Sequence, residues 1–279
     1  MGITKYIIKV PSKPDKVLDL ADVKTGLASG AHTITVEAWN GAALISTQTK
    51  NITIAAVAGT PTTGVVANYE FNETTGGLID SINAYNGLVN GTMGRNGTVY
   101  DFGVDTYVLI DDKDDFSFRG ATDDVPYTIR LKISFDAFTN GWVISKRDGV
   151  LNDFEYQLYV YDSILNFMLS DGSGNNNLTV SIPTTGLVTG TYYHIVVTYD
   201  GSKTAAGLKM SINKSETGTS SVMASSYVGA VNSPSKLILG RAEFTQGFYG
   251  NFKMDSLRFH KNYKWSAAEI SNDFDAIMV

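Results

Sequence analysis

The sequence contains no cysteine, so the fold has neither disulfide bonds nor thiolate-bound metal ions. Charged residues make up only 18% of the chain, and the formal net charge of −6 comes without any basic cluster. Because nucleic-acid-binding surfaces are strongly positive, we expect no nucleic acid partner. No apolar run approaches the roughly 18 residues of a membrane helix, and we expect no membrane insertion. Met1 to Pro11 also lacks the apolar core of a signal peptide.

Glycine and aromatic residues are abundant instead, with 27 Gly, 15 Tyr and 13 Phe, as is typical of turn-rich β proteins. The clearest local pattern lies between residues 193 and 212, where apolar and polar residues alternate on both sides of Asp200-Gly201. Such alternation marks strands with one buried face, and Asp-Gly favours a turn. The stretch therefore predicts a β-hairpin whose core-facing residues are Tyr193, Ile195, Val197, Tyr199, Leu208, Met210 and Ile212.

Residues 1–57 are predicted to form a small separate unit. His32–Asn40 alternates, Asn40-Gly41 is a strong hairpin signal, and residues 45–54 supply a returning strand. The stretch Leu27–Val36 resembles the second half of a fibronectin type III or immunoglobulin-like domain. Such sandwiches have about seven strands, whereas this unit has room for roughly four, so we expect an incomplete sandwich that docks on another chain. Residues 58–64 are small, contain Gly and Pro, and are expected to be a linker.

Residues 65–279 carry a series of motifs in a characteristic order. The series comprises Val66-Ala-Asn-Tyr-Glu-Phe71, Ile79-Asp80-Ser81, Val99-Tyr-Asp-Phe-Gly103, Pro126-Tyr-Thr-Ile129, Tyr192-Tyr-His194, Tyr199-Asp-Gly201 and Gly250–Phe259. It resembles laminin-G-like domains, which fold as concanavalin A-type jelly rolls. Ser266 and Glu269 have the spacing of a capping box, which predicts a closing helix over residues 267–276. The resemblance implies an all-β chain, with a concanavalin A-like jelly-roll sandwich after a small incomplete Ig- or fibronectin III-like sandwich.

Catalytic residues are not expected. Glycoside hydrolases, some of which share this fold, need two carboxylates about 5–10 Å apart across the sugar. Asp153-Phe154-Glu155 is the nearest candidate, but it lacks the Glu-x-Asp-x-x-Glu arrangement of glucanases, and a solvated loop accounts for it better. His32, His194 and His260 are isolated from any Ser or Cys context typical of a triad. The sequence therefore predicts a protein that is not an enzyme.

A calcium ion is implied only by the resemblance. Laminin-G-like jelly rolls often hold a structural Ca²⁺ between the Asp-Ser loop and the closing strand, and those places correspond to Asp80 and Asp255 here. Calcium is bound by several loop oxygens, and the local sequence has no EF-hand spacing. Two alternatives stay open, a calcium site at these residues and an empty, hydrogen-bonded loop.

Sugar-binding residues are sought among aromatic side chains, which stack on pyranose rings, and among the polar residues beside them. If Tyr156, Leu158 and Val160 face the core, period-two alternation places the polar and aromatic residues between them on the other face. The predicted ligand-binding residues are Gln157, Tyr159, Tyr161, an outward-facing Arg130 and Trp142, which is expected in a loop beside Gly141. The alternative is that these aromatic residues only cover a sheet or a subunit contact.

The arrangement of a docking unit followed by a lectin-like domain resembles bacteriophage virion accessory proteins such as head fibres or tail adhesins. The resemblance implies a non-enzymatic protein at the virion surface, or otherwise extracellular, that binds a bacterial surface glycan. Residues 1–57 would contact other virion proteins, and a homo-oligomer is expected. Two alternatives remain: a purely structural decoration protein without a ligand, and a carbohydrate-binding module of a carbohydrate-active system.

Overall fold

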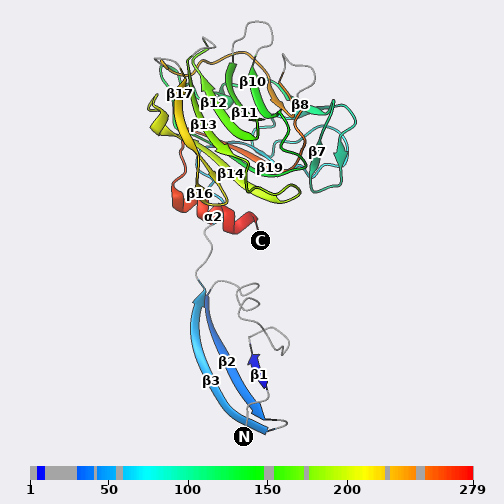
Figure 1. Cartoon of the computed structure of the whole chain (residues 1–279), viewed down its shortest axis with the longest axis vertical. Coiled ribbons are helices and arrows are strands. Elements are labelled where there is room, and N and C mark those ends of the chain that lie inside the picture. Colours follow the sequence, from blue (N-terminus) through cyan, green and yellow to red (C-terminus); the bar gives the residue numbers. More distant parts are fainter. Residues whose placement is uncertain are drawn as a thin grey trace. The chain divides into compact units, whose positions relative to one another are not determined.

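The computed structural model describes residues 5–9, 30–40, 43–54, 59–147, 154–172, 176–223, 227–242 and 249–278. The chain divides into two compact units, Met1–Gly59 and Thr60–Val279, and each is described by itself (Figure 1). Residues 60–64 belong to the second unit, because the carbonyl of Thr63 accepts a hydrogen bond from His260 Nδ1 at 2.8 Å. In the described part of the chain, no helix is long and apolar enough to cross a membrane.

The first unit contains an antiparallel sheet of β1 (Lys5–Lys9), β2 (Gly30–Asn40) and β3 (Ala43–Ile54), in the order β1-β2-β3. The predicted hairpin is confirmed, since β2 and β3 pair along their whole length. Within the described residues β3 pairs with β2 alone, so one edge of this 12-residue strand is open. Three strands are described where roughly four were predicted, and the likeness to an Ig-like half sandwich stays a prediction.

The second unit is a sandwich of two eight-stranded sheets, as the predicted jelly-roll fold requires (Figure 1). The front sheet consists of β5 (Gly87–Asn90), β8 (Tyr107–Ile110), β10 (Gly141–Arg147), β11 (Phe154–Tyr161), β12 (Ile164–Ser170), β13 (Asn177–Pro183), β17 (Thr219–Met223) and β18 (Leu237–Leu239). The back sheet consists of β4 (Val65–Tyr69), β6 (Gly94–Arg95), β7 (Tyr100–Phe102), β9 (Tyr127–Phe135), β14 (Tyr192–Tyr199), β15 (Leu208–Ile212), β16 (Ser215–Glu216) and β19 (Phe252–Lys261). Short 3₁₀ turns lie at Asp114–Phe116 and Ala205–Gly207.

Alternation along each strand decides which side chains enter the core between the two sheets. On β11, Tyr156, Leu158 and Val160 are buried, as predicted, and the intervening residues face outward. The predicted hairpin of residues 193–212 is also confirmed, because β14 and β15 pair with Val197 opposite Met210. Aromatic rings fill much of the space between the sheets, together with Leu, Ile, Val and Met side chains, and burial of this apolar surface is the main favourable contribution to folding.

Helix α2 (Ala267–Ile277) covers part of the outer face of the back sheet. The predicted capping box is present: Ser266 Oγ accepts a hydrogen bond from the Glu269 amide, and the Glu269 carboxylate accepts one from the Ser266 amide. These two bonds satisfy amides that the first helical turn leaves without partners. Ile270 and Trp265 then pack against Val196 of β14, which buries the apolar side of the helix.

A buried ionic cluster fixes α2 to the sheet. Asp273 accepts a hydrogen bond from His194 Nε2 at 2.8 Å and forms an ion pair with Arg130 Nε at 3.2 Å. Arg130 also donates to Ser256 Oγ at 2.5 Å. All three charged or titratable side chains of the cluster are at most 2% exposed. Arg130 was predicted to contact a ligand, whereas α2 covers it and its guanidinium is committed to Asp273 and Ser256.

The Asp273 carboxylate is expected to be essential for stability. Asp273→Ala should lower the free energy of unfolding by about 3–5 kcal/mol, because Arg130 would remain buried without a counter-charge. Asp275→Ala is the matched control in the same helix. Its partner Lys214 is 36% exposed, and such surface pairs contribute about 0–1 kcal/mol. Chemical denaturation of both variants measures the difference.

The same cluster gives the stability a defined pH dependence. Burial by itself raises the pKa of the Asp273 carboxyl, but the hydrogen bond from His194 and the charge of Arg130 outweigh it and hold that pKa below the ordinary 3.8. A carboxyl whose pKa is lower in the folded state than in the unfolded state stabilises the fold. The stabilisation is fully present at pH values above the unfolded-state pKa and is lost as the pH falls through the folded-state pKa. The difference in free energy of unfolding between the wild type and Asp273→Ala should therefore shrink as the pH falls through this acid range. A difference that stays constant would contradict the role given to the carboxylate.

Candidate functional site

The outer face of the front sheet carries rows of side chains that run across its strands. The strand register aligns Trp142, Tyr159, Asn166, Ser181 and Thr219 in one row. It aligns Ser145, Gln157, Met168, Thr179 and Ser221 in a second row. Arg147 and Asn177 continue the same alternation on β10 and β13. We call these twelve residues the polar face.

An aromatic pair lies at one end of the polar face. The rings of Trp142 and Tyr159 stack with centroids 6.1 Å apart and planes inclined by 26°. Trp142 Nε1 donates a hydrogen bond to Gln157 Oε1 at 3.0 Å. Trp142 was predicted in a loop, but it belongs to β10, where it is the cross-strand partner of Tyr159. Cross-strand aromatic pairs stabilise the pairing of two strands. The sequence of β10 alone does not show that Trp142 has such a partner.

Several polar atoms of this face are buried and have no hydrogen-bond partner. They are Ser145 Oγ, Gln157 Nε2, Asn177 Oδ1 and Thr179 Oγ1. Their side chains are at most 6% exposed. A buried polar atom without a partner costs about 1–3 kcal/mol, and in native proteins such atoms are usually satisfied by ordered water or a ligand. The polar face therefore holds unused hydrogen-bonding capacity beside an aromatic stack.

Glu155, the carboxylate nearest to this face in the sequence, points the other way. The pairing between β10 and β11 is irregular between Lys146 and Arg147. Lys146 Nζ lies 2.6 Å from Glu155 Oε2 and 2.7 Å from Asp112 Oδ1, and Ser117 donates to Glu155 Oε1. Burial raises the pKa of Glu155 to about 7, although Lys146 and Ser117 oppose that shift.

This arrangement bears on catalysis. Glu155 is fully buried, and its oxygens are committed to Lys146 and Ser117. Asp153, its companion in the candidate pair, lies outside the described residues. None of the twelve residues of the polar face is acidic, so the face does not offer the two carboxylates that glycoside hydrolysis needs.

The structure brings together three of the five predicted ligand-binding residues. Gln157, Tyr159 and Trp142 are in contact or adjacent on the polar face. Tyr161 follows at the end of β11 and is 52% exposed, whereas Arg130 lies on the back sheet. Sequence reasoning missed Ser145, Asn177 and Thr179. The alternation of Asn177-Leu-Thr-Val-Ser181 contains a signal for the last two, because polar residues occupy every second position.

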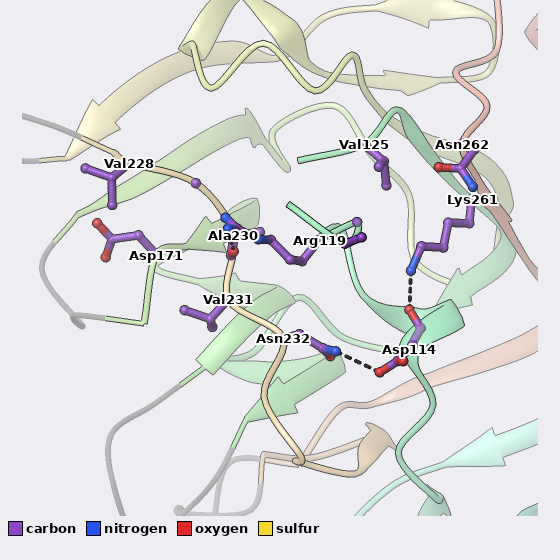
Figure 2. Close-up of a pocket in the computed structure, with 13 residues that line it drawn as sticks. Asp114, Arg119, Val125, Asp171, Val228, Ala230, Val231, Asn232, Lys261 and Asn262 are labelled. Carbon is purple, nitrogen blue, oxygen red and sulfur yellow. Dashed lines mark hydrogen bonds between the residues drawn. The ribbon is translucent and has the colours of Figure 1, made fainter. Parts of the chain in front are cut away.

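Another candidate site lies elsewhere in the second unit. It is a groove of about 1150 Å³ lined by Asp114, Arg119, Gly120, Ala121, Val125, Asp171, Val228, Gly229, Ala230, Val231, Asn232, Lys261 and Asn262. Figure 2 shows Asn232 and Lys261 directed at Asp114. The side-chain amide of Asn232 donates a hydrogen bond to the Asp114 carboxylate at 2.7 Å, and Lys261 Nζ donates one to the Asp114 backbone carbonyl. Arg119 donates to the Thr122 carbonyl at 3.0 Å. No lining side chain carries a buried polar atom without a partner, so the polar face is the stronger candidate.

A family model described as a concanavalin A-like lectin/glucanases superfamily domain, Laminin_G_3, matches residues 102–271, more than half of the chain. The chain belongs to the concanavalin A-like lectin/glucanase superfamily. The predicted laminin-G-like resemblance is thereby confirmed. No curated protein matches the sequence.

Solved structures with this superfamily fold include receptor-binding domains of botulinum neurotoxins. The domain of the C/D mosaic serotype matches with a TM-score of 0.59 and 10% identity, covering 77% of this chain and 52% of its own. The serotype DC binding domain in complex with rat synaptotagmin II gives 0.59 and 11%, covering 76% and 51%. A structure of botulinum neurotoxin type C, whose cell entry depends on interaction with two ganglioside molecules, gives a TM-score of 0.58 and 12% identity, with the same coverage. This chain spans about half the length of these structures, and such low identity establishes a shared fold alone.

The calcium site implied by the superfamily resemblance is tested by the surroundings of Asp80. Asp80 Oδ1 accepts backbone amides of Asn68 and Ile82 at 2.8 and 3.0 Å, and Oδ2 accepts those of Asn83 and Tyr85 at 2.9 and 3.1 Å. A carboxylate has about four lone-pair sites, so these bonds use all of them. Asp255 instead pairs with Lys132 at 3.3 Å, and the described residues contain no cluster of three or more His, Asp or Glu side chains placed for a metal. These residues do not fit a calcium ion.

The hydrogen-bonded loop and the calcium site make different predictions for melting. With the four-amide geometry, a chelator should leave the melting temperature unchanged. Asp80→Asn should lower the free energy of unfolding by about 1–3 kcal/mol whether or not chelator is present, because an amide nitrogen would face two backbone N–H donors. A drop in melting temperature on chelation that Asp80→Asn abolishes would restore the calcium hypothesis.

Proposed function

We propose that the jelly roll is a non-enzymatic glycan-binding module and that the polar face is its ligand site. The observation that carries this proposal is the set of buried, unpartnered polar atoms of Ser145, Gln157, Asn177 and Thr179 beside the Trp142–Tyr159 stack. Carbohydrates combine an apolar ring face with a dense array of hydroxyl groups. A site for them therefore needs an aromatic surface and several fixed hydrogen-bonding groups, and both lie on this face.

The chemistry of the face matches this ligand class in two further respects. Burial raises the pKa of Tyr159, so its hydroxyl stays protonated and available as donor and acceptor. The absence of acidic residues from the twelve described residues of the face favours binding over hydrolysis. Gangliosides and rat synaptotagmin II are ligands of the botulinum neurotoxins, and they support recognition by this fold by analogy alone.

The first unit is a candidate attachment domain for the glycan-binding module. Among the described residues β3 pairs with β2 alone, so its other edge can offer amides and carbonyls to another strand, and residues 44–49 of β3 are exposed. We infer that residues 1–57 attach the chain to an assembly, either of copies of itself or of other virion proteins, at a virion surface or another extracellular place. The ligand would then be a bacterial surface glycan. A purely structural decoration protein remains the second candidate, in which water fills the polar face.

Removing the aromatic stack should weaken glycan binding. On a glycan array and then by titration with the full chain, Trp142→Ala and Tyr159→Ala should each lose about 1–3 kcal/mol of binding free energy, the scale of burying one aromatic face. Tyr192→Ala is the matched control. Tyr192 is a half-buried aromatic on the back sheet, with Lys132 5.9 Å from its ring, and its removal should leave binding unchanged. A wild-type chain that binds no glycan would favour the decoration protein instead.

The docking role of the first unit is tested by separating it from the jelly roll. Residues 1–57 expressed alone should be oligomeric, aggregated or unfolded, because the three strands described there, with β3 paired on one side only, bury too little surface to be stable by themselves. Sedimentation and thermal melting distinguish these states. A monomer that melts cooperatively would remove the physical reason for attachment through this unit.

A further inference from the structure

A lysine amine is buried inside the sandwich in contact with two carboxylates. Lys146 alternates with the polar-face residues of β10, so its side chain points inward, and it is 0% exposed. Its Nζ lies 2.6 Å from Glu155 Oε2 and 2.7 Å from Asp112 Oδ1. Neither carboxylate oxygen is aligned for a hydrogen bond with the amine, whose aligned bond goes to the Ser233 carbonyl at 2.6 Å. The amine is therefore held against both carboxyl groups at once.

The cluster has more negative than positive charge when all three groups are ionised. Two carboxylates then face one ammonium, although Lys146 and Glu155 are both fully buried. Burial raises the pKa of Glu155 to about 7, and the charge of Asp112 adds to that shift, while Lys146 and Ser117 oppose it. Glu155 thus gains and loses a proton near neutral pH, in contact with the amine. A carboxyl group with these properties can carry protons to and from Lys146.

The two carboxyl groups differ in their access to solvent. Glu155 is fully buried, and its two oxygens contact Ser117 and Lys146. Asp112 lies in the loop between β8 and the 3₁₀ turn at Asp114–Phe116, and its side chain is 28% exposed. A water molecule released at Asp112 has a route to solvent, whereas the Glu155 side chain has no exposed surface through which water could leave. Asp112 is the better placed of the two to lose an oxygen.

We propose that Lys146 and Asp112 join in an intramolecular amide bond, an isopeptide, and that Glu155 carries the protons. The Lys146 ammonium passes a proton to the Glu155 carboxylate, and the neutral amine attacks Cγ of Asp112. The Nζ–Cγ bond forms and one Cγ–O bond breaks. The departing oxygen takes up two protons that came from the ammonium and leaves as water, so Glu155 returns to its starting state. The reaction consumes no oxidant, reductant or second substrate, and the inference is independent of glycan binding.

The surroundings favour this condensation. Burial disfavours charged groups, and the reaction replaces a buried ammonium and a partly buried carboxylate by a neutral amide. Reacting groups already in contact behave as if their effective concentration were about 10⁵–10⁸ M. The chain has no cysteine, so a disulfide is unavailable as a covalent tie. Because β18 lies between β8 and β10, the amide would clamp this part of the front sheet. The alternative is a cluster that stays ionic.

The mass of the intact, purified full chain tests the bond. The wild type should be lighter than the mass of its sequence by one water molecule. Trypsin should release residues 96–113 joined to residues 133–147, because the modified Lys146 is no longer a cleavage site. The peptide map is needed, because a succinimide at an Asp-Gly pair such as Asp171-Gly172 loses the same water without joining two peptides.

Three variants assign the roles within the cluster. Asp112→Ala should have the full mass of its own sequence, because the carboxyl group that reacts is missing. Glu155→Gln keeps the amine and Asp112 but removes the proton carrier, and it should form the bond at least about a hundredfold more slowly. Asp111→Asn is the matched control. Asp111 is 78% exposed and pairs with the exposed Lys236, so this variant should still lose one water. Thermal melting checks that each variant is folded.

Each outcome decides one part of the proposal. A wild type with the full sequence mass would overturn it and leave the cluster as an ionic contact. Joining of residues 133–147 to residues 148–203 would identify Glu155 as the carboxyl that reacts and would overturn the assignment to Asp112. Complete bond formation in Glu155→Gln at the rate of the wild type would overturn the role of Glu155. The expected result is a bond present in the wild type and Asp111→Asn and lost in Asp112→Ala.

Discussion

Each sheet of the jelly roll has two faces, and only one of them can be buried against the other sheet. The core between the sheets takes the apolar residues of every second position, such as Leu158 on β11 and Val197 on β14. Whatever lies on the alternate positions must be covered by something else, face water or bind a ligand. The two sheets differ in what contacts their outer faces.

The back sheet solves the problem within the chain. Helix α2 lies on it, and a buried cluster of Arg130, His194 and Asp273 joins the helix to two strands. Burying charges is costly, and the contacts of Asp273 with His194 and Arg130 offset that cost. The front sheet is treated differently. Most of its outer residues are polar, several of their atoms have no partner, and the rings of Trp142 and Tyr159 stack among them. Helix α2 thus covers part of the outer face of the back sheet, and buried polar atoms without a hydrogen-bond partner occur on both sheets, His194 Nδ1 and Trp265 Nε1 among them.

The irregular pairing between β10 and β11 places Glu155 and Gln157 on opposite sides of the front sheet. It accompanies an inward Glu155 that contacts Lys146 and Ser117, while Gln157, two residues later, is on the polar face. The Glu155 carboxylate is therefore not among the residues of the polar face. A strand without this irregularity would present Glu155 on the same face as Gln157.

The sequence by itself determined what depends on near neighbours. Period-two alternation predicted that Gln157 and Tyr159 share a face, and the Ser266–Glu269 spacing predicted the closing helix, because both patterns arise within a few residues. Tertiary structure alone decided the partners. Arg130 alternates like an outward residue, but whether a helix covers it depends on a segment more than a hundred residues away. Trp142 became a strand residue through its pairing with Tyr159, and Asp80 was saturated by amides that the turn of its own loop and the strand containing Asn68 bring together. A local pattern specifies which side of a strand a residue occupies, whereas only the long-range pairing of strands specifies what lies on that side.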